Sequence, residues 1–231
     1  MLAMNAWGIR FPEIRRRILV VGSDIVATEP IPDRLREIGW TDGVSISDSR
    51  LLVHYYRTTA DGRIVFGKGG GAIAWRDRVG AAFEGASRRR AVVDAALRST
   101  YPMLAGVPTP ASWTGPIDRS RTGLPLFGKL SGVGGAFFGA GYSGNGVGPS
   151  FLGGSILASL ALGRDDEWSG CGLVDARMGG FPPEPFRFVG GHLVRAAIVR
   201  KERLEDQGRS AGPATRGLVR LAPEGLVPAR R

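Results

Sequence analysis

The most informative part of the sequence is Gly139-Ala140-Gly141-Tyr142-Ser143-Gly144-Asn145-Gly146-Val147. A short β-rich run precedes it, and apolar residues spaced by four follow it at Leu152, Ile156 and Leu160. The pattern therefore predicts a strand, a glycine loop and a helix. Dense glycine lets the backbone approach a flat ligand closely, and the positive amino end of a helix favours an electron-rich group. The same pattern is also typical of a turn that only packs a helix against a sheet.

Gly139, Gly141 and Gly144 form a literal G-x-G-x-x-G, the fingerprint of dinucleotide binding, and acidic residues follow at Asp165 and Asp166. A standard dinucleotide fold needs a second apolar strand between the helix and the acidic residue. Here residues 163 and 164 lead directly into Asp165. We therefore do not favour a standard dinucleotide-binding unit at this loop.

Outward from the loop, the sequence predicts more strands than helices, and several strands are expected to be antiparallel, so the predicted class is α+β. Met1–Trp7 is typical of the end of a strand, and Asp61-Gly62 predicts a hairpin turn. Pro149 is expected to open the helix after the loop and Gly163 to close it. The expected strands are residues 18–31, 51–58, 63–68, 111–117, 124–130 and 136–138; the expected helices are residues 12–17, 32–38, 88–104, 149–162 and 191–207.

Charge gives little support for a nucleic-acid partner, although the formal net charge is +10. Only three of the 31 basic residues are lysine, and the arginines are spread along the chain. The clusters at residues 15–17 and 88–90 have no interleaved aromatic residues and lie beside helical patterns. A basic nucleic-acid-binding module therefore stays a minor alternative, which salt-sensitive retention on DNA would support.

Other classes of protein are disfavoured by composition. The single cysteine, Cys171, excludes an internal disulfide and is expected to be a buried small residue. His54 and His192 lie far apart with no cysteine at ligand spacing, so we expect no metal site. The uncharged stretch between Lys129 and Arg164 is interrupted by polar residues and glycine, and its apolar part is shorter than the roughly 20 residues of a membrane-spanning helix. We expect no membrane span, no secretory signal and a cytoplasmic location.

An ordered set of segments resembles the C-terminal half of the D-amino-acid-oxidase-like (DAO) family of FAD-dependent oxidoreductases. The most similar subgroup is the γ-glutamylputrescine-oxidoreductase-like amine and amino-acid oxidases. The segments are Leu2–Trp7, Gly22–Asp24 with Ala27–Pro32, Tyr55–Arg57 with Asp61–Gly67, Trp113–Gly115 with Thr122–Pro125, Gly141–Val147 and Phe181–Pro185.

The resemblance implies a mainly antiparallel substrate-domain sheet with flanking helices, plus an incomplete remainder of a Rossmann-like FAD domain. Residues 1–10 would end the FAD-binding domain and residues 11–125 would form the substrate domain. Residues 126–164 would return into the FAD-binding domain, and residues 165–231 would form a C-terminal helix and a partly ordered tail.

The resemblance also implies FAD as cofactor. The family's glycine loop lies along the isoalloxazine and ribityl, and the matching residues here are Gly141, Tyr142, Ser143, Gly144, Asn145, Gly146 and Val147. For the substrate pocket we name His54 and Tyr56, which share one face of a strand, and the aromatic Trp113. Tyr55 and Arg57 share the other face of that strand, and the sequence leaves open which of the two pairs faces the substrate. Ordinary sheet and core packing is the alternative for all of these residues. Asp118 and Arg119 are expected to be only a surface pair.

The sequence departs from the family in three respects. The family's dinucleotide fingerprint lies at the extreme N-terminus, outside this sequence, so the chain resembles a C-terminal portion. Ile117 stands where amino-acid oxidases often have an arginine for the substrate carboxylate, which favours amines. Residues 121–129 contain no cysteine of the kind that attaches flavin covalently in some relatives.

We therefore expect an FAD-dependent oxidoreductase that oxidises a C–N bond of a small amine or amino-acid-like substrate to an imine. Its expected partner is the missing N-terminal FAD-binding half. No dedicated acid or base is obligatory, since the flavin performs the redox chemistry. The alternative is a non-catalytic truncated remnant or subunit that does not bind flavin alone.

Overall fold

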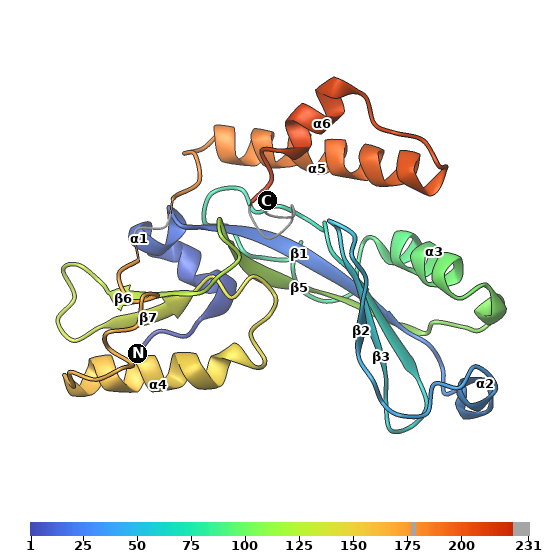
Figure 1. Ribbon diagram of the computed structural model, residues 1–231, viewed down its shortest axis with the longest axis horizontal. Coiled ribbons are helices and arrows are strands. Elements are labelled where there is room, and N and C mark those ends of the chain that lie inside the picture. The colour runs from blue at the N-terminus through green and yellow to red at the C-terminus, as the bar shows by residue number, and fades with distance from the viewer. Residues whose placement is uncertain (177–178, 224–231) are drawn as a thin grey trace.

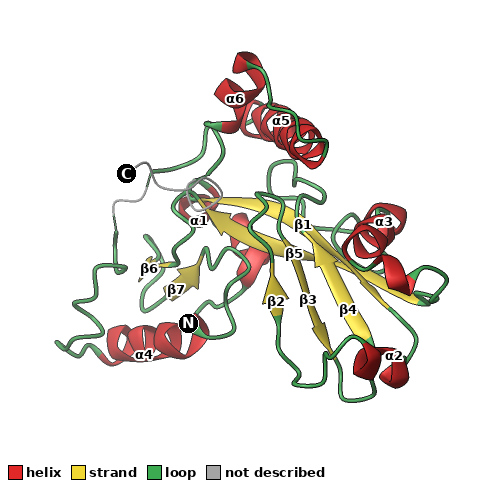
Figure 2. Cartoon of the chain, turned by 45° about the vertical axis from the view of Figure 1, so that its right-hand side comes forward, coloured by secondary structure: helices red, strands yellow, loops and turns green. Residues whose placement is uncertain are grey.

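The computed structural model describes residues 1–176 and 179–223. Its centre is a five-stranded antiparallel sheet of order β2-β3-β4-β1-β5 (Figures 1 and 2). The strands are β1 (Ile18–Ala27), β2 (Ile46–Ser47), β3 (His54–Thr58), β4 (Ile64–Lys68) and β5 (Ala111–Ser120). A separate antiparallel pair is made by β6 (Leu126–Lys129) and β7 (Phe137–Ala140). The predicted α+β class is confirmed, whereas the predicted domain boundaries stay predictions.

Helices lie on both sides of the large sheet and beside the small one. In Figure 1, α5 and α6 lie above β1, α3 lies near the far end of the sheet, and α4 runs beside β6 and β7. The helices are α1 (Pro12–Arg15), α2 (Pro32–Glu37), α3 (Arg90–Thr100), α4 (Pro149–Leu162), α5 (Phe186–Asp206) and α6 (Pro213–Val219), with 3-10 turns η1 (Asn5–Arg10) and η2 (Pro102–Leu104).

Strand alternation gives the large sheet two different faces. Even-numbered residues such as Val20, Val26, Ile64 and Phe66 are fully buried on one face. Val26, Ile64 and Phe66 pack there against Leu97 of α3 and its neighbours. Odd-numbered residues such as Leu19, Val21 and Ile25 point to the other face, toward α5. The sheet therefore has a sealed side under α3 and an open side under α5.

The predicted hairpin is confirmed between β3 and β4. Gly62 has φ +79° and accepts this left-handed conformation because it lacks a Cβ. The amide of Thr59 donates to the carbonyl of Arg63 at 3.0 Å, which closes the turn. The register that follows pairs Tyr55 with Gly67 and Tyr56 with Phe66.

The strand end predicted at Met1–Trp7 is confirmed only at Leu2, whose amide donates to Phe137 and whose carbonyl accepts the amide of Gly139. The chain makes only an isolated bridge from Leu2 to Phe138 and then turns into η1. Asn5 has φ +47°, which breaks the extended path. The short strand β2 and the helix α6 were not predicted. Helix α5 also begins at Phe186, earlier than its expected start at residue 191.

Candidate functional site

The glycine loop joins β7 to α4, as predicted. Gly141, Ser143 and Gly144 all have positive φ, at +79°, +59° and +90°. A Cβ at Gly141 would lie 2.8 Å from a methyl of Leu126, so the loop needs glycine there for two reasons. Pro149 stands in the first turn of α4, which leaves the last loop residues at the amino end of the helix.

Asp118 holds the first part of this loop, so the expectation of a surface pair is wrong. The residue is only 2% exposed. Its Oδ2 accepts the amide of Gly141 at 2.6 Å, and its backbone carbonyl accepts the amide of Ser143 at 3.2 Å. Burial raises the pKa of Asp118 to about 6, while the N–H of Gly141 opposes that rise. The residue fastens the loop to β5.

Ser143 adds a second attachment between the loop and β5. Its hydroxyl accepts the amide of Ser120 at 3.1 Å and donates to the carbonyl of Gly141 at 3.0 Å. A Cβ at Gly144 would lie 3.3 Å from Ile117, so that isoleucine packs directly beneath the turn. The inner half of the loop is thus fixed by the strand that carries residues 117–120.

The outer half of the loop offers its amides to a ligand. Among residues 1–176 and 179–223, the N–H groups of Gly144, Gly146, Val147 and Gly148 have no hydrogen-bond acceptor. Val147 is 97% exposed, and a Cβ at Gly148 would meet no atom within 4 Å. These N–H groups add to the positive end of the α4 dipole. The arrangement fits the electron-rich edge of a flat ring.

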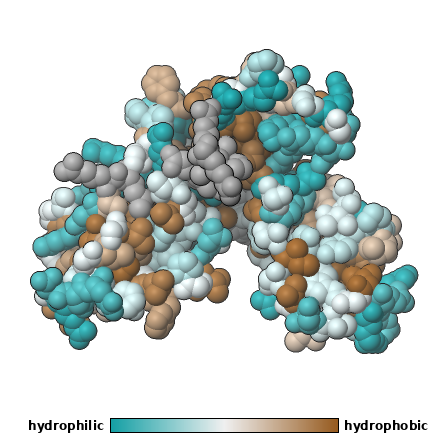
Figure 3. All heavy atoms as spheres, viewed as in Figure 1, coloured by the Kyte–Doolittle hydropathy of each residue, from teal (hydrophilic) through white to brown (hydrophobic). Residues whose placement is uncertain are grey.

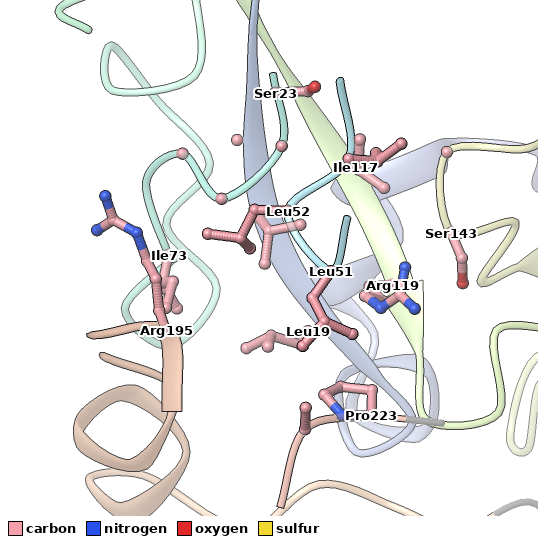
Figure 4. A pocket seen from close by; sticks show the side chains of 18 of the residues that line it. Leu19, Ser23, Leu51, Leu52, Ile73, Ile117, Arg119, Ser143, Arg195 and Pro223 are labelled. Atoms are coloured by element: carbon pink, nitrogen blue, oxygen red, sulfur yellow. The ribbon is translucent and has the colours of Figure 1, made fainter. Parts of the chain in front are cut away.

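The loop opens into a large apolar cavity of about 1030 Å³ between the sheet and α5. Ser143, Gly144 and Asn145 form part of its wall. Figure 4 shows Ser143 on the same side as Ile117 and Arg119 of β5, with leucines at the centre of the view. The loop is therefore not sealed inside the molecule, and it adjoins a space large enough for a small-molecule ligand.

Tyr55 and Trp113 face this cavity from β3 and β5. The hydroxyl of Tyr55 lies 2.7 Å from the hydroxyl of Ser23, and burial raises the pKa of Tyr55. The Tyr55 ring lies over Gly67, because a Cβ at that glycine would be 2.1 Å from the ring. Tyr55 and Arg57, the alternative pair on the face opposite His54 and Tyr56, both line the cavity.

His54 and Tyr56 point mainly to the sealed face. The Tyr56 ring stacks on Phe66 with centroids 5.0 Å apart, although Tyr56 also contributes to the cavity lining. His54 does not line the cavity; its Nδ1 lies 3.0 Å from Asp48. Burial and then the charge of Lys68 lower the pKa of His54 to about 4. Of the three predicted substrate residues, the structure brings Trp113 and Tyr56 to the cavity and leaves His54 outside it.

Three further observations concern the described residues. Cys171 is half-buried and packs beside the cluster around Phe127. No group of three or more His, Cys, Asp or Glu side chains among them is placed to hold a metal ion. None of their helices has both the length and the hydropathy needed to cross a lipid bilayer.

Comparison with known families gives a match over residues 1–160 to the family described as FAD dependent oxidoreductase (DAO). The chain belongs to this family. It is 34% identical over 173 residues to a protein of Haemophilus influenzae named probable oxidoreductase OrdL, covering 73% of this chain and 37% of that protein. It is 32% identical over 152 residues to gamma-glutamylputrescine oxidoreductase of Escherichia coli, covering 66% of this chain and 33% of that protein. The chain thus spans about a third of the length of these DAO relatives.

Two solved structures of oxidoreductases share the fold over about three quarters of this chain. Glycine oxidase from Geobacillus kaustophilus superposes with a TM-score of 0.54 at 20% identity, covering 75% of this chain and 44% of that one. Amadoriase I, the fructosyl amine:oxygen oxidoreductase from Aspergillus fumigatus, gives a TM-score of 0.58 at 12% identity, covering 75% and 41%. At such identities the likeness shows the fold alone.

The described residues of this DAO-family chain fit the ring of FAD at one place. The unused amides of residues 144 and 146–148 lie at the amino end of α4, where glycine leaves space for a flat group. The cavity that begins at Ser143 offers the adjoining space for a substrate. The assignment of residues 126–164 to a Rossmann-like remainder stays a prediction.

Proposed function

We propose that this chain forms the substrate domain and the ring-binding loop of an FAD-dependent oxidoreductase. The enzyme would oxidise a C–N bond of an amine or amino-acid-like substrate to an imine. The observation that carries the proposal is the glycine loop at the edge of the large cavity, with amides that no described residue uses. Membership of the DAO family supports it, as does a relative named gamma-glutamylputrescine oxidoreductase.

The loop amides of residues 144 and 146–148 would hold the ring of FAD, which would supply the hydride-accepting chemistry that converts the C–N bond to an imine, with a proton released from the substrate nitrogen. The loop amides would stabilise negative charge on the ring edge. The cavity face of β1 and β5 would keep water from the reacting bond, with Ile25, Trp113 and Ile117 as its apolar wall. We propose for the ring the residues predicted from the sequence, Gly141–Val147, together with Gly148, whose N–H has no acceptor among the described residues.

We further propose that an FAD-binding half covers the surface around α4. This helix is apolar all round, yet Phe151 is 78% exposed and Leu162 is 65% exposed. Figure 3 shows apolar side chains reaching the surface over this part of the molecule. Monomeric proteins rarely leave such an apolar surface uncovered. The covering half would supply the contacts for the pyrophosphate and adenosine.

The test is the absorbance spectrum of the purified chain after incubation with FAD and gel filtration. A retained flavin spectrum that bleaches when an amine substrate is added supports the proposal. A folded chain that stays colourless with added FAD favours the alternative, a non-catalytic remnant or subunit. The DNA upstream of the Met1 codon provides a separate test of the partner, since an in-frame strand, G-x-G-x-x-G and helix would encode the FAD-binding half.

A further inference from the structure

The charged side chains around the large cavity all have the same sign. Among the described residues that line it, six are charged, and none of these is acidic. They are Arg57, Arg119, Arg121, Arg187, Arg195 and Arg220. A cavity with this lining favours a ligand that carries negative charge. Most of these arginines are either exposed or paired, so their individual environments decide where an anion would bind.

The guanidinium of Arg195 is partly buried at the cavity wall. Arg195 projects from α5 beside Ile73 (Figure 4), and its Nε is buried without a hydrogen-bond acceptor among residues 1–176 and 179–223. Arg187, on the same helix, is by contrast paired with Glu184 at 2.8 Å. A buried guanidinium N–H without an acceptor is costly, so its retention at the cavity wall points to an anionic ligand.

Asp24 is the carboxylate among the described residues whose charge favours protonated Arg195, and it already binds two other groups. Asp24 accepts the hydroxyl of Ser87 at 2.7 Å through Oδ1 and the guanidinium of Arg89 at 2.9 Å through Oδ2. Two guanidinium groups, Arg89 and Arg195, therefore share the field of one carboxylate. Burial and then the charge of Arg89 lower the pKa of Arg195, which is the electrostatic effect that an added anion would relieve.

Arg195 and the glycine loop lie on opposite sides of the cavity. In Figure 4, Arg195 stands on one side of the cavity, and Ser143, Ile117 and Arg119 stand on the other. Leu19, Leu51 and Leu52 lie between the two sides. Ile117 packs against Gly144 and offers no charge beneath the loop. An anion on Arg195 would therefore lie across an apolar space from the loop.

We propose that Arg195 binds a carboxylate of the substrate at the wall of the cavity opposite the glycine loop. The substrate class is then an amine whose carboxylate is separated by an aliphatic chain from the C–N bond that is oxidised. The inference rests on the proposed function in taking the cavity ligand to be the substrate. The binding of a carboxylate at Arg195 is tested without flavin.

The experiment is isothermal titration calorimetry on the full chain with two probes of equal chain length. One is 5-aminopentanoate, and the other is pentylamine, which has a methyl in place of the carboxylate. We expect 5-aminopentanoate to bind about tenfold or more tightly than pentylamine, since a charge-assisted hydrogen bond is lost in the amine. Equal affinities, or no binding of either probe, would overturn the proposal without any variant being made.

Arginine variants test whether the carboxylate of the probe binds at Arg195. Arg195→Gln should remove the difference between the two probes, whereas Arg200→Gln, an exposed arginine of the same helix outside the cavity lining, should preserve it. If R195Q still bound 5-aminopentanoate more tightly than pentylamine, and R119Q did not, the assignment to Arg195 would be overturned. Carboxylate-dependent binding by a chain that never retains FAD would contradict the proposed function and leave the Arg195 site standing.

Discussion

Asp118 links the glycine loop to the sheet through a carboxylate that is almost fully buried. Burial raises its pKa from an ordinary 3.8 to about 6. The unfolded chain releases this proton near pH 4, but the folded chain releases it only near pH 6. The folded state therefore binds more protons in this window, and the contribution of Asp118 to stability is lost as the pH rises through it.

Replacement of Asp118 by Asn should remove this pH dependence. At about 1.4 kcal/mol per pH unit, the interval between 3.8 and about 6 corresponds to about 3 kcal/mol. We expect the free energy of unfolding of D118N, relative to the parent, to increase by about 2–3 kcal/mol from pH 4 to pH 7, since part of the effect lies below pH 4. Urea unfolding at both pH values measures it. The exposed control Asp165→Asn should show no comparable change, and equal behaviour of the two variants would contradict the role of Asp118.

The sequence predicted the glycine loop itself, but it did not predict that Asp118 binds the loop to β5. The glycine pattern and Pro149 are local signals for a turn and a helix start. Asp118 beside Arg119 has the local pattern of a surface pair, and its burial depends on the pairing of β5 with β1 and on the loop that packs beneath it. Arg195 was likewise missed, because a helical arginine gives no sequence signal that it faces a cavity.

The pairing of β3 with β4 supports one wall of the cavity. Tyr55 lies over Gly67, and this contact leaves its hydroxyl 2.7 Å from Ser23. Gly67→Ala would place a Cβ 2.1 Å from the Tyr55 ring. We expect this variant to lose about 1–3 kcal/mol of stability by overpacking. It should also lower the affinity of cavity ligands, because the Tyr55 ring must move.

Gly69→Ala is the matched control for G67A. Its Cβ would meet its nearest neighbour at 3.6 Å, an ordinary contact. Thermal unfolding followed by circular dichroism compares the two variants. A loss in G69A as large as that in G67A would contradict a specific requirement for glycine beneath Tyr55.

Glu202 attaches helix α5 to the segment between β2 and β3. Its Oε1 accepts the buried amide of Leu52 at 2.8 Å, and Arg50 pairs with Asp206 one turn further on at 2.7 Å. We expect Glu202→Ala to reduce the free energy of unfolding by about 1–3 kcal/mol, because the amide of Leu52 would be left buried without an acceptor.

The control for E202A is Glu205→Ala, which removes a half-exposed partner of Lys201 on the same helix. A surface pair of this kind contributes about 0–1 kcal/mol. Urea unfolding at neutral pH measures both variants. If E205A lost as much stability as E202A, attachment through the Leu52 amide would not be the cause.

Most elements were predictable from hydrophobic periodicity and from turn chemistry, as the Asp61-Gly62 hairpin and the helix after Pro149 illustrate. The failures have physical reasons. Strand β2 has two residues, too few for alternation to be seen. Helix α6 lies in a segment rich in glycine, proline and arginine, although Pro213 marks its first turn. At Asn5 a positive φ ends an extended pattern that the apolar sequence would otherwise continue.

At the scale of the whole molecule, the sheet divides the chain into a sealed side and an open side. The even-numbered face packs on α3, whereas the odd-numbered face borders a cavity that extends from Arg195 to the glycine loop. The loop leads directly into α4 at the edge of the molecule (Figure 1), and α4 carries the exposed side chains of Phe151 and Leu162. The sequence predicted the loop and the antiparallel sheet, but the cavity arises from how α5 returns over β1, which no local pattern encodes.

The central claim is that the outer half of the glycine loop contacts the flavin ring. Gly148 and Gly154 provide a matched pair, because neither has a positive φ and a Cβ at either position would meet no atom within 4 Å. Leucine at position 148 would occupy the space before the unused amides, whereas leucine at position 154 would lie on the exposed side of α4.

The most direct measurement is a fluorescence titration of riboflavin, which carries the ring without the pyrophosphate, against the parent chain, Gly148→Leu and Gly154→Leu. We predict quenching by the parent and by G154L, and an affinity lower by about tenfold or more in G148L, equivalent to about 1.4 kcal/mol. Circular dichroism confirms that both variants keep the parent's secondary structure. Absence of quenching by the parent, or equal affinity of G148L and G154L for the ring, would contradict the account.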